Sequence, residues 1–319
     1  MNKLNNKRFY KVISLFIKSL ILILSFYYIY QKIVTAPLAM DAFSFNLENA
    51  FYILLIFLLM LANWSLEALK WKLLVAPLEL ISFFASLKAV FAGVTVSILT
   101  PNRVGEFAAR VFFLEKADKI KASVASLAGS LMQLAVTIAA GMLAYYTLQV
   151  KYYDFFQTEQ FISTNALLLI LLIAIALIAS VGFIWLKKST TFIRYKKNLE
   201  VFSLYSKRDW NQVFLLSLIR YMVFSLQYYL VLRLFGINAG PVILFSLIAL
   251  TFFATSAIPT FALTEIAVRA GTAVYFFSTI NSDLSAIIAS SLFLWIINIA
   301  LPALMGSAFV WKLKFFKES

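Results

Sequence analysis

Two stretches of the sequence place a glutamate four residues before an arginine inside otherwise apolar segments. In "TPNRVGEFAAR" the residues are Glu106 and Arg110, and in "IPTFALTEIAVR" they are Glu265 and Arg269. Residues four apart on a helix lie on one face, so each acid can neutralise its arginine. A charge at the centre of a bilayer costs about 2.5 to 3.5 kcal/mol, and charges kept there usually face a polar cavity or a bundle interior. These four residues are therefore the first candidates for a binding site.

A proline opens each of these stretches. Proline suits the first turn of a helix, so we expect Pro101 and Pro259 to begin helices whose unpaired N–H groups and partial positive charge lie near the membrane midplane. Two helix starts that approach from opposite sides would form an anion site. Arg103, Arg110 and Arg269 would strengthen its positive field, and the acids would hold these arginines or meet a cationic group on the ligand.

Each charged candidate also has a plainer interpretation. The two Glu to Arg pairs either contact a ligand or act as structural pins. Arg103 is either a ligand-binding residue or an ordinary positive residue at the cytoplasmic surface. Arg220, which lies inside an apolar segment, either faces the bundle interior or extends its side chain to the interface.

Several common kinds of chemistry are excluded by the composition. The chain has no cysteine and no histidine, which removes thiol nucleophiles, disulfides, zinc and haem sites built on those ligands, and the usual general base near neutral pH. Glu67, Glu79, Glu115 and Asp118 lie near predicted cytoplasmic ends of segments, but they form no evident catalytic constellation. We therefore expect no metal, no cofactor and no enzymatic activity.

The elements that must position these residues are membrane helices. Of the 319 residues, 63% are hydrophobic and 13% charged, and the mean hydropathy is +0.90. These values lie outside the range of a soluble globular domain and indicate an all-α polytopic membrane protein. The net charge of +14 does not indicate nucleic-acid binding, because the basic residues cluster at the ends of apolar spans.

Six full spans are predicted from length and apolarity, and two further apolar windows look like broken helices. The spans lie near 12–30, 50–72, 121–148, 164–186, 210–235 and 284–311. The windows 80–116 and 241–280 are interrupted by proline, small residues and charges, so we expect each to be a re-entrant hairpin.

The basic segments orient this arrangement, because lysine and arginine in short loops favour the cytoplasm. The N-terminal segment 3–11, the long loop 187–208 and the tail 312–317 are strongly basic, whereas 31–49 and 149–163 contain acids. The prediction is a multi-pass protein of a bacterial-type inner membrane with both termini in the cytoplasm. Lys70 and Lys72 are expected where the second span returns to the cytoplasm.

The two halves of the chain share one order of elements in opposite orientation. Residues 1–155 and 156–319 each read span, span, hairpin 80–116 or 241–280, span. Both hairpins carry the sequence Glu, any residue, Ala, any residue, Arg after a proline, whereas chance placement predicts roughly 0.2 such Glu to Arg spacings in the chain. This pattern is typical of the inverted-topology repeats of secondary transporters.

At these same residues the chain resembles the lysylphosphatidylglycerol synthase transmembrane region, also called the flippase-like domain family. The stretches "LTPNRVGEFAARVFFL" and "AIPTFALTEIAV" are similar to the motifs of that family. The sequence departs from the family in two ways. Residues 260–264 stand where the family usually has glycines. The aminoacyl transferase domain of the large members is absent from these 319 residues, so synthase activity is not carried over. With the resemblance included, the predicted binding residues are Pro101, Arg103, Gly105, Glu106, Arg110, Arg220, Pro259, Glu265 and Arg269.

The resemblance implies a role in moving or handling lipids. The leading hypothesis is a flippase for an anionic-headgroup phospholipid or a lipid-linked intermediate, bound between the two hairpins at the midplane. One alternative is a membrane-embedded transferase that acts on a lipid-linked substrate, and another is a non-transporting partner subunit of a lipid-modifying enzyme. A homo-oligomer is a further expectation that the sequence leaves open.

Overall fold

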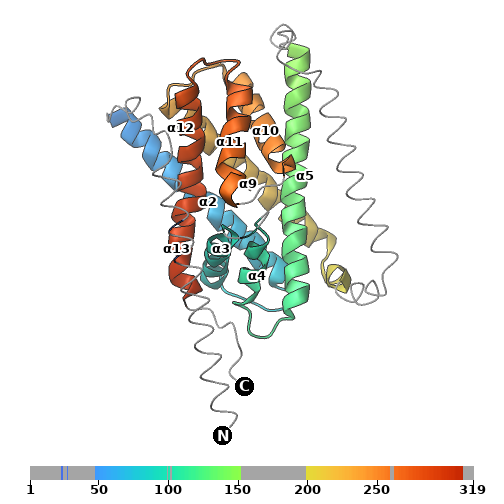
Figure 1. Ribbon diagram of the computed structural model, residues 1–319. Helices are drawn as coiled ribbons and strands as arrows, with labels where there is room; N and C mark the ends of the chain where they lie inside the picture. Colours follow the sequence, from blue (N-terminus) through green and yellow to red (C-terminus); the bar gives the residue numbers. More distant parts are fainter. Residues whose placement is uncertain are drawn as a thin grey trace.

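In the computed structural model, every regular element of the described residues is helical (Figure 1). The structure describes Ile23, Tyr27, 47–98, 100, 103–151, 199–258 and 262–311. The predicted all-α class is confirmed for these residues. The predicted spans near 12–30 and 164–186 lie outside the described residues, apart from Ile23 and Tyr27.

Among the described residues, four helices are long and apolar enough to cross a membrane, and they match four of the predicted spans. They are α2 (Leu47–Val75), α5 (Lys119–Lys151), α9 (Lys207–Leu234) and the rod formed by α12 (Leu284–Trp295), the π-helical turn η4 (Ile296–Ala300) and α13 (Leu301–Val310). A turn of 3-10 helix, η3 (Glu200–Leu204), precedes α9. The chain is a multi-pass membrane protein.

The two windows predicted to be broken each form two shorter helices that pack against each other. The first window gives α3 (Phe83–Ser97) and α4 (Gly105–Val111), and the second gives α10 (Pro241–Ala257) and α11 (Ala262–Phe277). In Figure 1 the pair of α3 and α4 occupies one end of the molecule, and the pair of α10 and α11 occupies the other.

The prediction that Pro101 begins the second helix of its window is wrong. The N-cap of α4 is Val104, and the N–H of Gly105 donates to Thr100 Oγ1 at 2.8 Å. This hydroxyl takes up one of the unpaired N–H groups on which the predicted helix-start anion site depended. Pro101 and Pro259 themselves lie outside the described residues.

One short helix from each half of the chain packs on a long helix of the other half, an arrangement called here the exchange of short helices. In the first half, α3 packs on α13 from the second, while α10 of the second half packs on α5 from the first, and α2 packs along α9. Two glycines permit the close approaches. A Cβ at Gly306 would overlap the backbone of Phe91 in α3, and one at Gly141 would lie 2.7 Å from Cβ of Phe253 in α10. Each glycine lies 22 residues after the first residue of its rod, Lys119 or Leu284.

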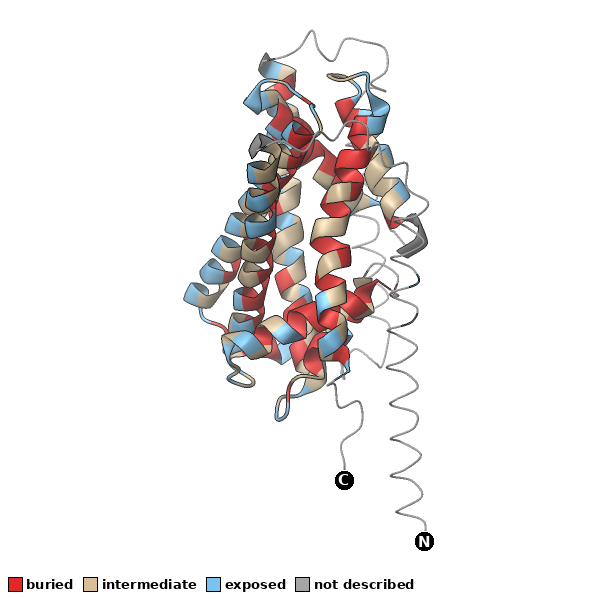
Figure 2. Ribbon diagram, turned by 90° about the vertical axis from the view of Figure 1, so that its left-hand side faces the viewer, coloured by how far each residue is buried: buried red, intermediate tan, exposed pale blue. Residues whose placement is uncertain are grey.

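The packed interior lies between these helices, and apolar side chains cover the outside. Figure 2 shows exposed residues on the outward faces of the helices and buried residues on the inward faces. One buried apolar cluster joins α2, α3 and the α12 to α13 rod, and a second joins α9, α10 and α11. Exposed large apolar residues such as Leu58, Leu131 and Met222 fit contact with lipid chains.

One carboxylate ties together two loops at the end of the molecule where α4 lies. Glu79, between α2 and α3, accepts hydrogen bonds from the backbone N–H groups of Glu115, Lys116 and Ala117 at 3.1, 2.7 and 2.8 Å. Partial burial raises the pKa of Glu79, but the three N–H donors outweigh that effect and hold the pKa below its ordinary value. The charged form of Glu79 therefore holds the loop before α5.

Candidate functional site

A cavity of about 460 Å³ lies where the two pairs of short helices meet the long helices. Its size falls in the range of about 300 to 1,000 Å³ that is typical of small-molecule sites. The charged residues that line it are Arg103, Arg220, Glu265 and Arg269. These four residues come from the break after α3, from α9 and from α11, so elements far apart in the sequence form one site.

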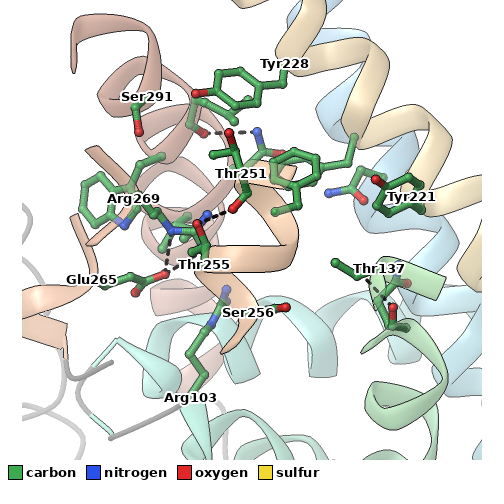
Figure 3. Close-up of a pocket in the computed structure, with 18 of the residues that line it drawn as sticks. Arg103, Thr137, Tyr221, Tyr228, Thr251, Thr255, Ser256, Glu265, Arg269 and Ser291 are labelled. Carbon is green, nitrogen blue, oxygen red and sulfur yellow. Dashed lines mark hydrogen bonds and ion pairs between the residues drawn. The ribbon is translucent and has the colours of Figure 1, made fainter. Parts of the chain in front are cut away.

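The predicted pair on α11 is formed at the edge of this cavity. Arg269 Nε and Nη2 both donate to Glu265 Oε1, at 3.1 and 3.0 Å. Glu265 is buried, whereas the side chain of Arg269 is about a quarter exposed. Figure 3 shows Arg103 extending from below toward this pair, with Thr255 and Ser256 of α10 beside it.

Arg103 reaches the cavity from an unusual backbone conformation. Its φ is +59°, and it is the one non-glycine residue with a positive φ in the described part of the chain. This left-handed conformation costs an L-residue roughly 1–2 kcal/mol, and such strain tends to occur at functional sites. Arg103 Nε donates to Ser97 Oγ at 3.3 Å, and Nη2 lies 3.8 Å from Glu106 Oε2.

Arg220 connects the cavity with a buried carboxylate. Its Nη1 lies 3.0 Å from Oε2 of Glu67, and its guanidinium carbon lies 5.5 Å from the ring centroid of Trp64. Both partners are on α2, one turn apart. The structure thus favours the bundle-facing interpretation of Arg220 over extension to the interface.

Glu67 is the centre of an ion-pair network behind the cavity. Besides Arg220, it binds Lys70 at 2.8 Å through Oε2 and Arg110 at 2.8 Å through Oε1. Arg110 also donates to Glu106, as the four-residue spacing predicted. Glu67, Lys70 and Arg110 are each at most 4% exposed, so the network links α2, α4 and α9 in the interior.

The network and the cavity together contain more cations than carboxylates. Among the described residues, five basic side chains and three acidic ones take part in the ion pairs of the network and of the cavity, which leaves an excess of two positive charges. Uncompensated buried charge is costly in an apolar bundle, so this excess favours a bound anion. The basic residues are Lys70, Arg103, Arg110, Arg220 and Arg269, and the acidic ones are Glu67, Glu106 and Glu265.

Not all the predicted residues line the cavity. Gly105, Glu106 and Arg110 are absent from the lining, and the two charged residues among them belong to the network behind it. Gly105 packs instead against Thr100, because a Cβ there would lie 2.8 Å from two of its side-chain atoms. Of the predicted set, Arg103, Arg220, Glu265 and Arg269 come together at the cavity.

Sequence reasoning missed the role of Glu67 and placed Lys70 incorrectly. Lys70 is 2% exposed inside α2, so it is no loop charge, while Lys72 in the last turn is exposed. An acid inside a predicted span was the available signal, because intramembrane acids usually have a function. The described residues contain no group of three or more His, Cys, Asp or Glu that could hold a metal ion.

Neutral polar side chains complete the lining. Asn298 projects from the π-helical turn η4, a kind of irregularity that often accompanies functional sites. Gln133 and Thr137 come from α5, and Thr251 and Ser256 from α10. The arginines and these polar groups give the cavity charged and neutral polar groups inside an apolar bundle.

Comparison with known proteins identifies the family. No curated protein and no solved structure matches the chain. The family model described as the lysylphosphatidylglycerol synthase TM region matches residues 15–306. That match includes both broken windows and every residue that lines the cavity, and the chain therefore belongs to the family of the lysylphosphatidylglycerol synthase TM region.

Proposed function

We propose that this protein is a lipid flippase that moves an anionic-headgroup phospholipid or lipid-linked intermediate across the membrane. The observation that carries the proposal is the positive excess around a cavity lined by Arg103, Arg220 and Arg269. A phosphate group would satisfy these arginines, because guanidinium groups bind phosphate oxygens strongly. Membership of a family named after a lipid synthase supports a lipid cargo.

The proposed path uses the two pairs of short helices as re-entrant hairpins of an inverted repeat. Six spans, two hairpins and both termini in the cytoplasm of an inner-membrane protein complete this topology. Its support is the exchange of α3 and α10 between the halves, together with the equal positions of Gly141 and Gly306 in their rods. Broken helices that meet near the midplane are the usual substrate site of such repeats.

Transbilayer movement of lipid in liposomes tests the proposal. Purified protein is reconstituted with acyl-labelled phosphatidylglycerol, and movement is followed by quenching the label in the outer leaflet. We expect Arg220→Gln and Arg269→Gln to reduce the rate at least tenfold, because each removes a charged phosphate donor from the cavity lining. The matched control is Arg233→Gln, which changes an exposed arginine on α9, the helix that carries Arg220.

Two results would contradict the proposal. One is the absence of protein-dependent movement for any anionic lipid tested. The other is an equal rate for Arg220→Gln, Arg269→Gln and the Arg233→Gln control. Covalently altered lipid recovered after incubation with activated donors would instead favour a transferase.

A further inference from the structure

Three neutral side chains of the cavity lining, Thr137, Thr251 and Ser256, present hydrogen-bond acceptors and are called the acceptor wall here. The hydroxyls of Thr137, Thr251 and Ser256 each donate to a backbone carbonyl of their own helix, at 3.0, 2.7 and 2.7 Å. A hydroxyl that has donated its proton keeps only lone pairs for a second partner. These three lining residues can therefore accept hydrogen bonds from a ligand but have no proton left to donate.

Two amide side chains add to this acceptor character. Gln133 Nε2 donates to the carbonyl of Ser217 at 3.2 Å, and Asn298 Nδ2 donates to the carbonyl of Leu294 at 3.1 Å. Only the NH₂ group can donate to a carbonyl, so these bonds fix the orientation of both amides. The oxygens left over, Oε1 of Gln133 and Oδ1 of Asn298, have no hydrogen-bond partner among the described residues.

The donors that line the cavity include cationic ones that are not saturated. Arg220 Nε and Arg103 Nη2 have no hydrogen-bond partner within the described parts of the chain, although both side chains take part in ion pairs. The one acid in the lining, Glu265, is already engaged by Arg269. The cavity thus offers charged donors to an anion, and its acceptor wall offers neutral acceptors to groups that bear O–H. The hydroxyls of Tyr221 and Tyr228 also line it and can donate or accept.

We propose that the cavity selects a headgroup in which a phosphodiester is joined to a neutral, hydroxyl-bearing group, such as a glycerol or a sugar. This inference rests on the proposed function and narrows its cargo. The arginines bind the phosphate, and Thr137, Thr251 and Ser256 accept from the hydroxyls. An ammonium group could also meet these acceptors, but the positive excess of the site opposes it. A lysylated headgroup is therefore a poor ligand.

Binding of defined lipids to the full chain in detergent tests this selection. The probes are short-chain phosphatidylglycerol, phosphatidylethanol, lysylphosphatidylglycerol and a polyprenyl-phosphate sugar. Phosphatidylethanol keeps the phosphodiester but lacks hydroxyls. Tryptophan fluorescence reports binding, because Trp64 and Trp295 line the cavity. We expect phosphatidylglycerol to bind about tenfold more tightly than phosphatidylethanol, a difference of about 1.4 kcal/mol, and lysylphosphatidylglycerol to bind most weakly.

Variants of the acceptor wall connect the preference to these side chains. In the combined variant Thr137→Val, Thr251→Val and Ser256→Ala, the tenfold ratio should fall to near one. Thr147→Val is the matched control, because Thr147 makes the same bond on α5, to Leu143 at 2.8 Å, but lies outside the cavity lining. If the combined variant does not fold, the single variant Ser256→Ala should reduce the ratio about threefold.

The outcomes separate this inference from the proposed function. Equal binding of both phosphodiesters by the wild type, tightest binding of the lysylated lipid, or an unchanged ratio in the variants would overturn the inference alone. If no phosphodiester bound or moved, the proposed function would fall with it. Preference for phosphatidylglycerol assigns a glycerol headgroup, and preference for the polyprenyl lipid assigns a sugar.

Discussion

At the scale of single residues, Glu67 holds the charged interior together. It is the one carboxylate in the described network that contacts three cations, from α2, α4 and α9. Removing one partner of a buried ion pair destabilises strongly, because the remaining charge is left uncompensated. The position of Arg220 beside the cavity therefore depends on an acid that does not itself line it.

Glu67→Gln should lower the free energy of unfolding by about 3–5 kcal/mol, because Lys70 and Arg220 then lose their carboxylate partner and Arg110 keeps only Glu106. Unfolding of the detergent-solubilised protein in increasing SDS measures this. Combining the change with Arg110→Gln should cost less than the two single losses added together. Glu200→Gln, an exposed acid, is the control, and equal losses for Glu67→Gln and Glu200→Gln would refute the central role of Glu67.

The backbone strain at Arg103 gives a second test at this scale. Arg103→Gly and Arg103→Ala both remove the side chain, but only glycine relieves the positive φ of +59°. The glycine variant should therefore be about 1 kcal/mol more stable than the alanine variant. Both should lose phosphate binding. An alanine variant as stable as the glycine variant would mean that the left-handed conformation is not maintained.

The sequence predicted the local charge pairs because their partners lie one helical turn apart. Glu106 with Arg110 and Glu265 with Arg269 are paired as the spacing indicated. The pairing of Glu67 with Arg110 spans 43 residues of sequence, and no local pattern encodes it. The acceptor wall of Thr137, Thr251 and Ser256 was likewise not predicted, because it depends on which face of α5 and α10 turns inward.

At the scale of elements, close backbone packing decides where the short helices sit. The helix α3 lies against α13 at Gly306, and Thr95 Oγ1 in α3 donates to the carbonyl of Ala303 at 2.7 Å. Small residues allow membrane helices to approach closely, and hydroxyl groups can bond across the interface. The pair of α3 and α4 is therefore anchored on α13.

Gly306→Ala should destabilise the protein by about 1–3 kcal/mol, because its Cβ would overlap the backbone of Phe91. Gly141→Ala should have a smaller effect, since the added Cβ would lie 2.7 Å from Cβ of Phe253, against a closer approach to the Phe91 carbonyl oxygen at Gly306. The control is Gly271→Ala on α11, where a Cβ meets nothing within 4 Å and where alanine should be neutral or stabilising by up to about 1 kcal/mol. Similar stability of all three variants would argue against the close packing.

The three hydrogen bonds that Glu79 accepts make one contribution to the stability of the protein dependent on pH. The pKa of Glu79 is lowered in the folded protein, so its stabilisation is fully present above the ordinary glutamate pKa of about 4.3. The stabilisation is lost as the pH falls from there through the lowered pKa, because the unfolded chain binds the proton first. Melting temperatures between pH 7 and pH 3.5 should therefore fall more for the wild type than for Glu79→Gln. An equal fall in melting temperature for the wild type and for Glu79→Gln would contradict this expectation.

The short helices were predictable as elements, but their starting points were not. Proline, small residues and charges revealed the breaks in 80–116 and 241–280. The start of α4 at Gly105 coincides with the hydrogen bond that the Gly105 N–H donates to Thr100 Oγ1 and with tight packing against Thr100. Contacts of this kind are not readable from the sequence pattern of the segment alone.

At the scale of the whole molecule, the pairs of short helices at the two ends of the bundle come from different halves of the chain. The loop before α5 lies at the end with α4, and the turn before α12 lies at the opposite end (Figure 1). The basic segments and the apolar spans predicted the membrane class, and the family match confirms the suspected family. The exchange of α3 and α10 between halves was not predicted, because sequence order places each beside its own neighbours.

The proposed topology predicts labelling from opposite sides of the membrane. The wild type has no cysteine, so Asp118→Cys and Ser282→Cys each introduce a single exposed thiol. In intact cells, an impermeant maleimide should label Ser282→Cys, and Asp118→Cys only after the membrane is opened. The cysteine-free wild type is the control. Labelling of both from one side would exclude the inverted arrangement.

The contact of Thr95 with Ala303 also determines when α3 can complete its packing during synthesis of the chain. These residues are 208 positions apart, and ribosomes add about 5–20 residues per second. A newly inserted α3 therefore waits about 10 to 40 seconds for the helix that completes its packing. During this interval its small-residue face is open to chaperones, to the insertion machinery or to another nascent chain, and mutations that slow the second half should act first on the folding of the first.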